Sequence, residues 1–159
     1  MKKVINGILN TLIIIMGLLL LTPNILLNFG INSFVVLSGS MEPLIETGSM
    51  VMINSRDTDV EIGDIVLYRL NQTNVVHRII EETEDGKYIT KGDNNENADF
   101  APVSEVQIYG KAIKMPWGWC IPKAGYISNW VQTNRLYLII GIIAMILFRI
   151  LTIILNDEK

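Results

Sequence analysis

The sequence predicts a small, mainly β domain, an antiparallel sheet or partial barrel, flanked by N- and C-terminal transmembrane helices. Residues 4–29 contain no charged side chain, and residues 136–155 contain only Arg149. The segment between them holds 9 of the 13 Lys and Arg residues and 14 of the 16 Asp and Glu residues. In that segment short apolar runs alternate with clusters of turn-forming residues, a pattern typical of antiparallel strands.

The N-terminal segment, residues 1–24, is expected to be an uncleaved transmembrane signal anchor. Its apolar part, Val4 to Leu21, has about the minimum length for a helix that spans the hydrocarbon layer. A cleavable signal peptide would have a shorter apolar core and a small-x-small cleavage site, whereas Thr22-Pro23-Asn24 is expected simply to end the helix. Lys2 and Lys3 place the N-terminus in the cytoplasm by the positive-inside rule, so the following domain would lie outside.

The central segment, residues 25–135, is expected to form the extracytoplasmic β domain. Residues 25–37 would lie against the membrane surface and then enter the strand that leads to Ser40. Five further strands are expected, at Met50–Asn54, Asp64–Leu70, Val75–Glu82, Tyr88–Lys91 and Gln107–Met115. The acidic balance leaves no basic stripe to meet phosphates, so a nucleic-acid partner is not expected.

The C-terminal segment, residues 136–155, fits a second spanning helix, and residues 156–159 would form a cytoplasmic tail. Arg149 lies near the end of this helix, where it could extend toward the cytoplasmic face. Trp130 and Tyr137 suit the outer membrane interface.

The single cysteine, Cys120, can form no disulfide within the chain and has no second Cys with which to bind a metal. A packed thiol is the simplest interpretation. Two tryptophans precede it, Trp117 and Trp119, and they would either insert into the membrane interface or pack against the β core. The sequence favours neither. With one histidine and one cysteine in the chain, no metal or cofactor is expected.

Three clusters could carry chemistry. Ser38-Gly39-Ser40-Met41-Glu42-Pro43 follows an apolar run and is either an ordinary turn or the turn that presents a nucleophilic serine. His77 is the only histidine, and strand alternation places it on one face with Val75 and Ile79. It is either a packing residue or a general base. The polar stretch from Lys91 to Asp99 is either a solvated loop or the source of an acid that orients His77.

These clusters together resemble the signal peptidase I family, in its endoplasmic-reticulum, archaeal and SipW-like branch. The matching pieces are Ser38-Gly39-Ser40-Met41-Glu42-Pro43, Gly63-Asp64-Ile65-Val66, Val76-His77-Arg78 and Lys91-Gly92-Asp93-Asn94-Asn95 with Asp99. They occur in the order of the family and span about sixty residues. Each piece alone is a weak signal, whereas four in order after a membrane anchor are a strong one.

The resemblance implies a role for each matching residue. Ser40 is expected to be the nucleophile and His77 the general base. Asp93 and Asp99 match the acidic positions of the family, with Asp93 the firmer functional candidate. The Ser38 hydroxyl and the Ser40 backbone N–H would bind the oxyanion. The ordinary bacterial branch uses a lysine base instead, and Lys91 is the only lysine at a motif position here.

The resemblance also implies partners and a location. The substrates would be signal peptides of secreted preproteins, with small side chains preferred at the first and third positions before the cut. The enzyme would lie in a cell membrane, or in the endoplasmic reticulum membrane of a eukaryote, in contact with lipid and with the secretion machinery. The alternatives are a membrane-anchored β-rich binding module without activity, and a protease of the self-cleaving repressor type, against which the spanning segments argue.

Overall fold

The computed structural model describes residues 2–157, which form two compact units. A helical unit comprises residues up to 25 and from 129 onward, and a second unit of residues 26–128 contains the sheet. The long helices are α1 (Lys2–Asn28) and α3 (Arg135–Asp157). Both the antiparallel sheet and the two terminal apolar helices agree with the fold predicted from the sequence.

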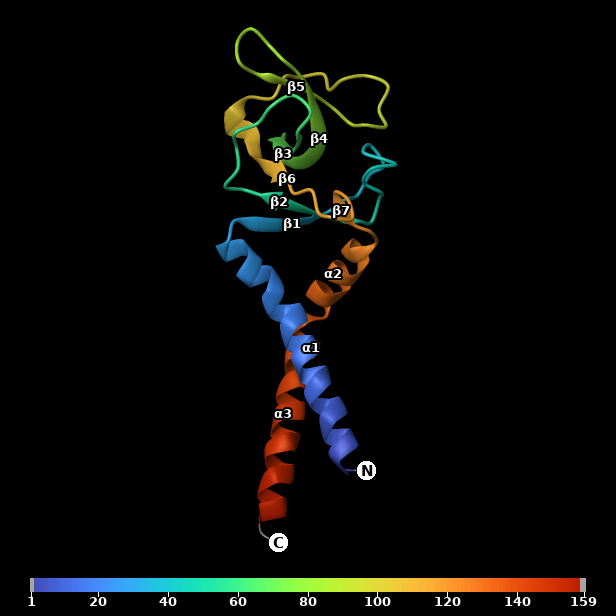
Figure 1. Ribbon diagram of the computed structural model, residues 1–159, viewed down its shortest axis with the longest axis vertical. Helices are drawn as coiled ribbons and strands as arrows, with labels where there is room; N and C mark the ends of the chain where they lie inside the picture. The colour runs from blue at the N-terminus through green and yellow to red at the C-terminus, as the bar shows by residue number, and fades with distance from the viewer. Residues whose placement is uncertain (1, 158–159) are drawn as a thin grey trace. The chain divides into compact units, whose positions relative to one another are not determined.

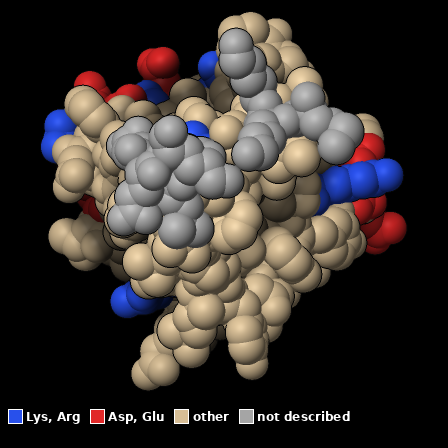
Figure 2. All heavy atoms as spheres, turned by 90° about the horizontal axis from the view of Figure 1, so that it is seen from below, with Lys and Arg blue, Asp and Glu red and all other residues tan. Residues whose placement is uncertain are grey.

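Both terminal helices have the length and composition needed to cross a membrane. The candidate spans are Val4–Asn28, of 25 residues, and Arg135–Ile154, of 20 residues. Their side chains are not buried within the structure, so the apolar surface is available to lipid. In the face of the molecule that Figure 2 shows, uncharged side chains predominate and charged ones are few.

Helix α1 continues four residues beyond the Thr22-Pro23-Asn24 turn at which the sequence predicts its end. Proline lacks the backbone N–H that would continue the helical hydrogen-bond ladder. Polar side chains on either side bond back to the preceding turn: Thr22 Oγ1 donates to the Leu18 carbonyl at 2.6 Å, and Asn24 Nδ2 donates to the Leu20 carbonyl at 3.2 Å. Such bonds satisfy carbonyls near the proline and keep a helix intact in an apolar environment.

The sheet of the second unit has seven strands within residues 2–157. Their bounds are β1 (Ile31–Val35), β2 (Met50–Asn54), β3 (Ile65–Leu70), β4 (Thr73–Glu82), β5 (Tyr88–Lys91), β6 (Ile108–Ala112) and β7 (Cys120–Ile121). The order is β1-β2-β6-β3-β4-β5, with β7 also paired to β2, and every pairing is antiparallel. Figure 1 shows β4 as a strongly curved ribbon, and its pairing with β5 shifts register between Ile79 and Glu81.

The observed strands follow the predicted ones closely. β2 and β5 have the predicted bounds, and β4 begins two residues early because the turn before it is shorter than expected. That turn is Asn71-Gln72, where both residues have positive φ, 46° and 68°. A two-residue hairpin with this backbone matches the right-handed twist of the flanking strands. Strand β7 and the helix α2 (Ala124–Thr133) are not predicted from the sequence.

Strand β3 is buried on both faces, because it separates two apolar clusters. Ile65 and Leu67 point into the first cluster, with Met41, Ile45, Val51, Ile53 and Cys120. Val66 and Tyr68 point to the opposite face, with Val60, Ile79, Val103 and Ile108. Alternation along a strand produces this division. The two tryptophans differ: Trp119 packs against the first cluster, whereas Trp117 is 68% exposed.

Candidate active site

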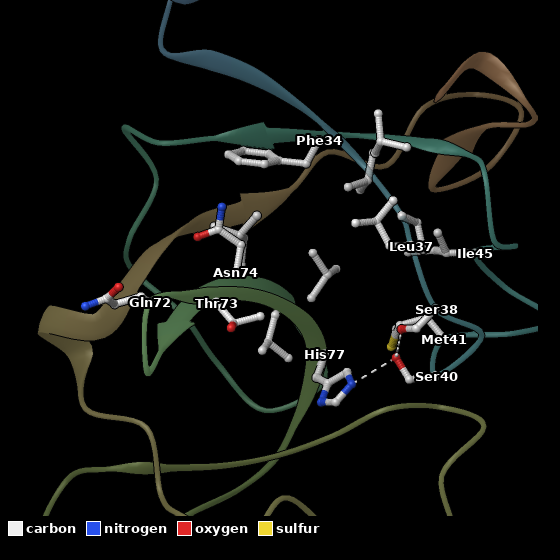
Figure 3. A pocket seen from close by; sticks show the side chains of 16 residues that line it. Phe34, Leu37, Ser38, Ser40, Met41, Ile45, Gln72, Thr73, Asn74 and His77 are labelled. Carbon is white, nitrogen blue, oxygen red and sulfur yellow. Dashed lines mark hydrogen bonds between the residues drawn. The ribbon is translucent and has the colours of Figure 1, made fainter. Parts of the chain in front are cut away.

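Ser40 lies in the turn that follows β1, residues 38–45, which we call the serine turn. Two apolar side chains of this turn pack into the first cluster. Met41 and Ile45 are almost completely buried, and the Ile45 N–H donates to the Met41 carbonyl at 2.9 Å. Burial of each of these side chains stabilises the loop by roughly 1.5–3 kcal/mol. The turn therefore has a fixed place in the fold, and it presents the side chain of Ser40 toward β4 (Figure 3).

The two predicted oxyanion donors lie together at this turn. The Ser38 hydroxyl is exposed and lies 3.4 Å from Ser40 Oγ. The Ser40 backbone N–H donates no hydrogen bond to any residue of the described range 2–157. A free N–H and a hydroxyl beside a serine side chain are the types of donor that an oxyanion needs.

His77 projects from β4 beside Ser40, and its two ring nitrogens have different partners. Nε2 lies 3.0 Å from Ser40 Oγ, and Nδ1 lies 2.6 Å from Asp99 Oδ2. An ionised carboxylate only accepts hydrogen bonds, so the proton belongs on Nδ1, and Nε2 is left to accept from the serine hydroxyl. His77 is only 7% exposed. The predicted shared face with Ile79 is confirmed, because both residues are buried in β4.

Asp99 receives three hydrogen bonds on the same carboxylate oxygen. Besides His77, the Thr90 hydroxyl donates to Oδ2 at 2.6 Å and the Tyr68 hydroxyl donates at 2.8 Å. The Asp99 backbone N–H donates to the Thr90 carbonyl at 2.8 Å, which ties the loop to the edge of β5. The sequence alone does not identify Tyr68 or Thr90, because neither belongs to a motif and both reach the site only through strand pairing.

Asp93, the other predicted acid, forms an ion pair with Arg78 and does not contact His77. Arg78 Nε donates to Asp93 Oδ1 at 2.9 Å and Nη2 donates to Oδ2 at 2.7 Å, while Nη1 donates to the Gly63 carbonyl at 2.8 Å. The Asp93 bond raises the pKa of the guanidinium, and partial burial lowers it by less. The structure thus brings Ser38, Ser40, His77 and Asp99 together and gives Asp93 a different partner.

The loop after β5 also braces the serine turn. The Asn94 backbone N–H donates to the Ser40 carbonyl at 2.8 Å, and Asn94 Nδ2 donates to the Gly39 carbonyl at 3.1 Å. Gly92 makes this approach possible, because a Cβ at that position would lie 2.5 Å from the Ser40 carbonyl oxygen and 3.0 Å from His77 Nε2. The Gly92-Asp93-Asn94 motif therefore holds the turn that carries Ser40 close to the strand that carries His77.

A groove of about 740 Å³ opens beside Ser40 and His77. Figure 3 shows both residues at one end of the cavity, with Phe34 and Asn74 farther along it. Its walls are the chain from β1 to the serine turn and the first half of β4, with apolar side chains that include Phe34, Val36, Leu37, Ile45, Val51 and Leu67. The groove therefore offers an apolar surface that ends at the Ser40 hydroxyl.

Residues 33–113 match the model of the Peptidase S24-like family. The chain belongs to this family. The matched segment of this S24-like chain contains all of the residues described above, from Ser38 to Asp99, and neither of the two terminal apolar helices.

The S24-like chain is also similar to a curated protein named "Signal peptidase complex catalytic subunit SEC11". The sequences from Saccharomyces cerevisiae strains YJM789 and RM11-1a are each 34% identical to it over an alignment of 110 residues that covers 64% of this chain. The match covers 66% of each relative, just under two thirds of its length. This similarity confirms the resemblance to signal peptidases that the four motifs predicted.

The electrostatics of the S24-like site keep its acid ionised. Burial raises the pKa of the Asp99 carboxyl, but the hydrogen bonds from Thr90, His77 and Tyr68 together lower it below its ordinary value. Burial is also the main reason that the pKa of the Tyr68 phenol is raised, so that this group keeps its proton. Within residues 2–157 no cluster of three or more His, Cys, Asp or Glu side chains is placed to hold a metal ion.

Proposed function

We propose that the chain is a membrane-bound signal peptidase, a serine endopeptidase that removes N-terminal signal peptides from secreted preproteins. The observation that carries the proposal is the chain of contacts from Ser40 Oγ through the His77 ring to Asp99 Oδ2, with separations of 3.0 and 2.6 Å. It lies at the end of a groove large enough for a peptide. The similarity to a signal peptidase catalytic subunit supports the class of substrate.

The first half of the proposed reaction forms an acyl-enzyme. Ser40 Oγ attacks the scissile carbonyl carbon while its proton moves to His77 Nε2, and Asp99 stabilises the imidazolium that results. The negative charge that develops on the carbonyl oxygen is accepted by the Ser40 N–H and the Ser38 hydroxyl. The C–N bond then breaks as the imidazolium gives its proton to the leaving amine, which is the N-terminus of the mature protein.

The second half returns the enzyme to its starting state. A water molecule transfers a proton to His77 Nε2 and attacks the ester carbon on Ser40. The ester bond breaks, Ser40 Oγ recovers its proton from the imidazolium, and the signal peptide leaves with a free carboxylate. Neutral imidazole is restored, so the same base serves both halves of the reaction.

The two apolar helices support a location at the membrane. A signal peptide has an apolar core, so its cleavage site is held near the surface of a bilayer. An enzyme anchored at residues 1–24 and 136–155 is confined to the same surface, which raises the effective concentration of enzyme and substrate. On this proposal residues 25–135 are extracytoplasmic and residues 156–159 form a cytoplasmic tail. The membrane is a cell membrane, or that of the endoplasmic reticulum in a eukaryote.

The yeast relative SEC11 is named as the catalytic subunit of a signal peptidase complex. We extend this to the proposal that the chain contacts the secretion machinery in its membrane.

The test compares the wild type with Ser40→Ala for cleavage of a secreted preprotein in membranes, with the cut located by N-terminal sequencing of the product. We expect the wild type to release the mature protein and Ser40→Ala to leave only background cleavage. Equal processing by the two proteins would refute the proposal and favour a membrane-anchored binding module. Ser104→Ala provides a matched control, since Ser104 lies beside a short 3-10 helix outside the site.

A further inference from the structure

The Asp99 carboxylate accepts hydrogen bonds from two buried hydroxyl groups in addition to the one from His77. Its Oδ2 atom accepts from His77 Nδ1 at 2.6 Å, from Thr90 Oγ1 at 2.6 Å and from Tyr68 Oη at 2.8 Å. The Thr90 and Tyr68 oxygens are themselves only 3.1 Å apart. Two hydroxyl groups thus converge on the very oxygen that contacts the proposed base.

The two hydroxyls come from the strands on either side of His77. Tyr68 lies on β3 and is 1% exposed, Thr90 lies on β5 and is 0% exposed, and His77 lies on β4 between these strands. Phenylalanine and valine would fill the same space without a polar group to bury. A buried hydroxyl costs free energy unless it is hydrogen-bonded, so their placement on a single carboxylate oxygen points to a role beyond packing.

These hydrogen bonds change the field that His77 experiences. The O–H dipoles of Tyr68 and Thr90 direct their positive ends at Oδ2, which spreads the negative charge of Asp99 and weakens its attraction for a proton on the ring. The titratable groups that face this cluster are His77, Asp99 and Tyr68. Arg78, next along β4, is already paired with an acid, and the alternation of β5 directs Lys91 to the face opposite Thr90.

We infer that Tyr68 and Thr90 are positioning residues: they fix the rotamer of Asp99 and share its negative charge, so that the carboxylate holds the His77 ring with Nε2 directed at the Ser40 hydroxyl. This inference rests on the proposed function. It predicts that each hydroxyl affects catalysis through Asp99 and His77, although neither touches the substrate.

The test is the pH dependence of kcat/KM for preprotein cleavage by the full chain in detergent. Tyr68→Phe removes one donor and leaves more negative charge on Asp99 beside the ring, so the acidic limb of the profile should move to higher pH by about half a unit or more. At neutral pH kcat should fall about tenfold or more, the usual cost of a hydrogen bond to a charged group, while KM changes little. Thr90→Val should do the same.

Three controls separate positioning from a merely structural role. Tyr88→Phe alters a tyrosine on β5 whose hydroxyl makes no hydrogen bond within residues 2–157, and it should leave the profile in place. Thr90→Ser keeps the hydroxyl and should recover most of what Thr90→Val loses. In an Asp99→Ala background Tyr68→Phe should cause no further loss of rate, because the two changes act on one interaction.

The outcomes distinguish this inference from the proposed function. A uniform loss of rate by Tyr68→Phe and Thr90→Val, with the acidic limb unmoved and full additivity with Asp99→Ala, would overturn the inference. If Tyr68→Phe fails to fold, the Thr90→Val and Thr90→Ser pair decides by the same criteria. Wild-type cleavage no greater than that of Ser40→Ala would instead refute the proposed function.

Discussion

Replacing Gly92 with alanine tests whether the site requires a residue without a side chain at this position. The φ of Gly92 lies outside the left-handed region, so alanine can adopt the same backbone conformation. The added Cβ would lie 2.5 Å from the Ser40 carbonyl oxygen, whereas ordinary contact begins at 3.4 Å. The serine turn or the loop after β5 must therefore move by about 0.9 Å. Such overpacking typically destabilises a protein by about 1–3 kcal/mol.

The expected effect on activity is larger than the effect on stability. The same Cβ would lie 3.0 Å from His77 Nε2, so the movement lengthens the 3.0 Å contact between that nitrogen and Ser40 Oγ. A misplacement of about 1 Å can reduce the rate about 10²-fold.

The assay for Gly92→Ala is the rate of preprotein cleavage per mole of folded enzyme in membranes. Gly17→Ala is the control, because within residues 2–157 no atom apart from the chain neighbours and the backbone of the same helix lies within 4 Å of the added Cβ. Wild-type rates in Gly92→Ala would refute the claim that this loop sets the distance between base and nucleophile.

Three further predictions concern the oxyanion donor, the acid and the loop. Ser38→Ala should reduce kcat by about 10²–10³ with little change in KM, and an unchanged kcat would exclude the hydroxyl as an oxyanion donor. The lowered pKa of Asp99 stabilises the folded state above the ordinary carboxyl pKa of about 3.9, and this contribution is lost as the pH falls through that value and then through the folded pKa. The melting temperature of Asp99→Asn should therefore lie below that of the wild type at pH 7 and approach it at about pH 3, while a pH-independent difference would contradict the assignment. Arg78→Lys keeps the charge but not the paired bonds to Asp93, so denaturant unfolding should show a loss of about 1–2 kcal/mol that the exposed Arg69→Lys does not share.

The sequence predicted those parts of the site that lie close together in the chain or follow strand periodicity. Ser38 and Ser40 share one turn, and alternation in β4 assigns His77 to a buried face. The strand ranges followed from short apolar runs between turn residues, so β2 and β5 have their predicted bounds.

Other parts depend on tertiary pairing and could not be predicted in this way. The choice between Asp93 and Asp99 depends on the path of one loop: Asp93 meets Arg78, and the Asp99 N–H bonds the edge of β5, which directs its carboxylate to His77. Tyr68 reaches the site only because β3 pairs with β4, a contact between strands that no motif encodes.

One comparison of variants decides which residue is the general base. Preprotein cleavage in membranes is measured for His77→Ala and for Lys91→Ala against Ser40→Ala as background. We predict that His77→Ala cleaves no faster than this background and that Lys91→Ala retains activity, because His77 Nε2 lies 3.0 Å from Ser40 Oγ. Full activity in His77→Ala, together with loss in Lys91→Ala, would contradict this prediction and assign the base to the lysine.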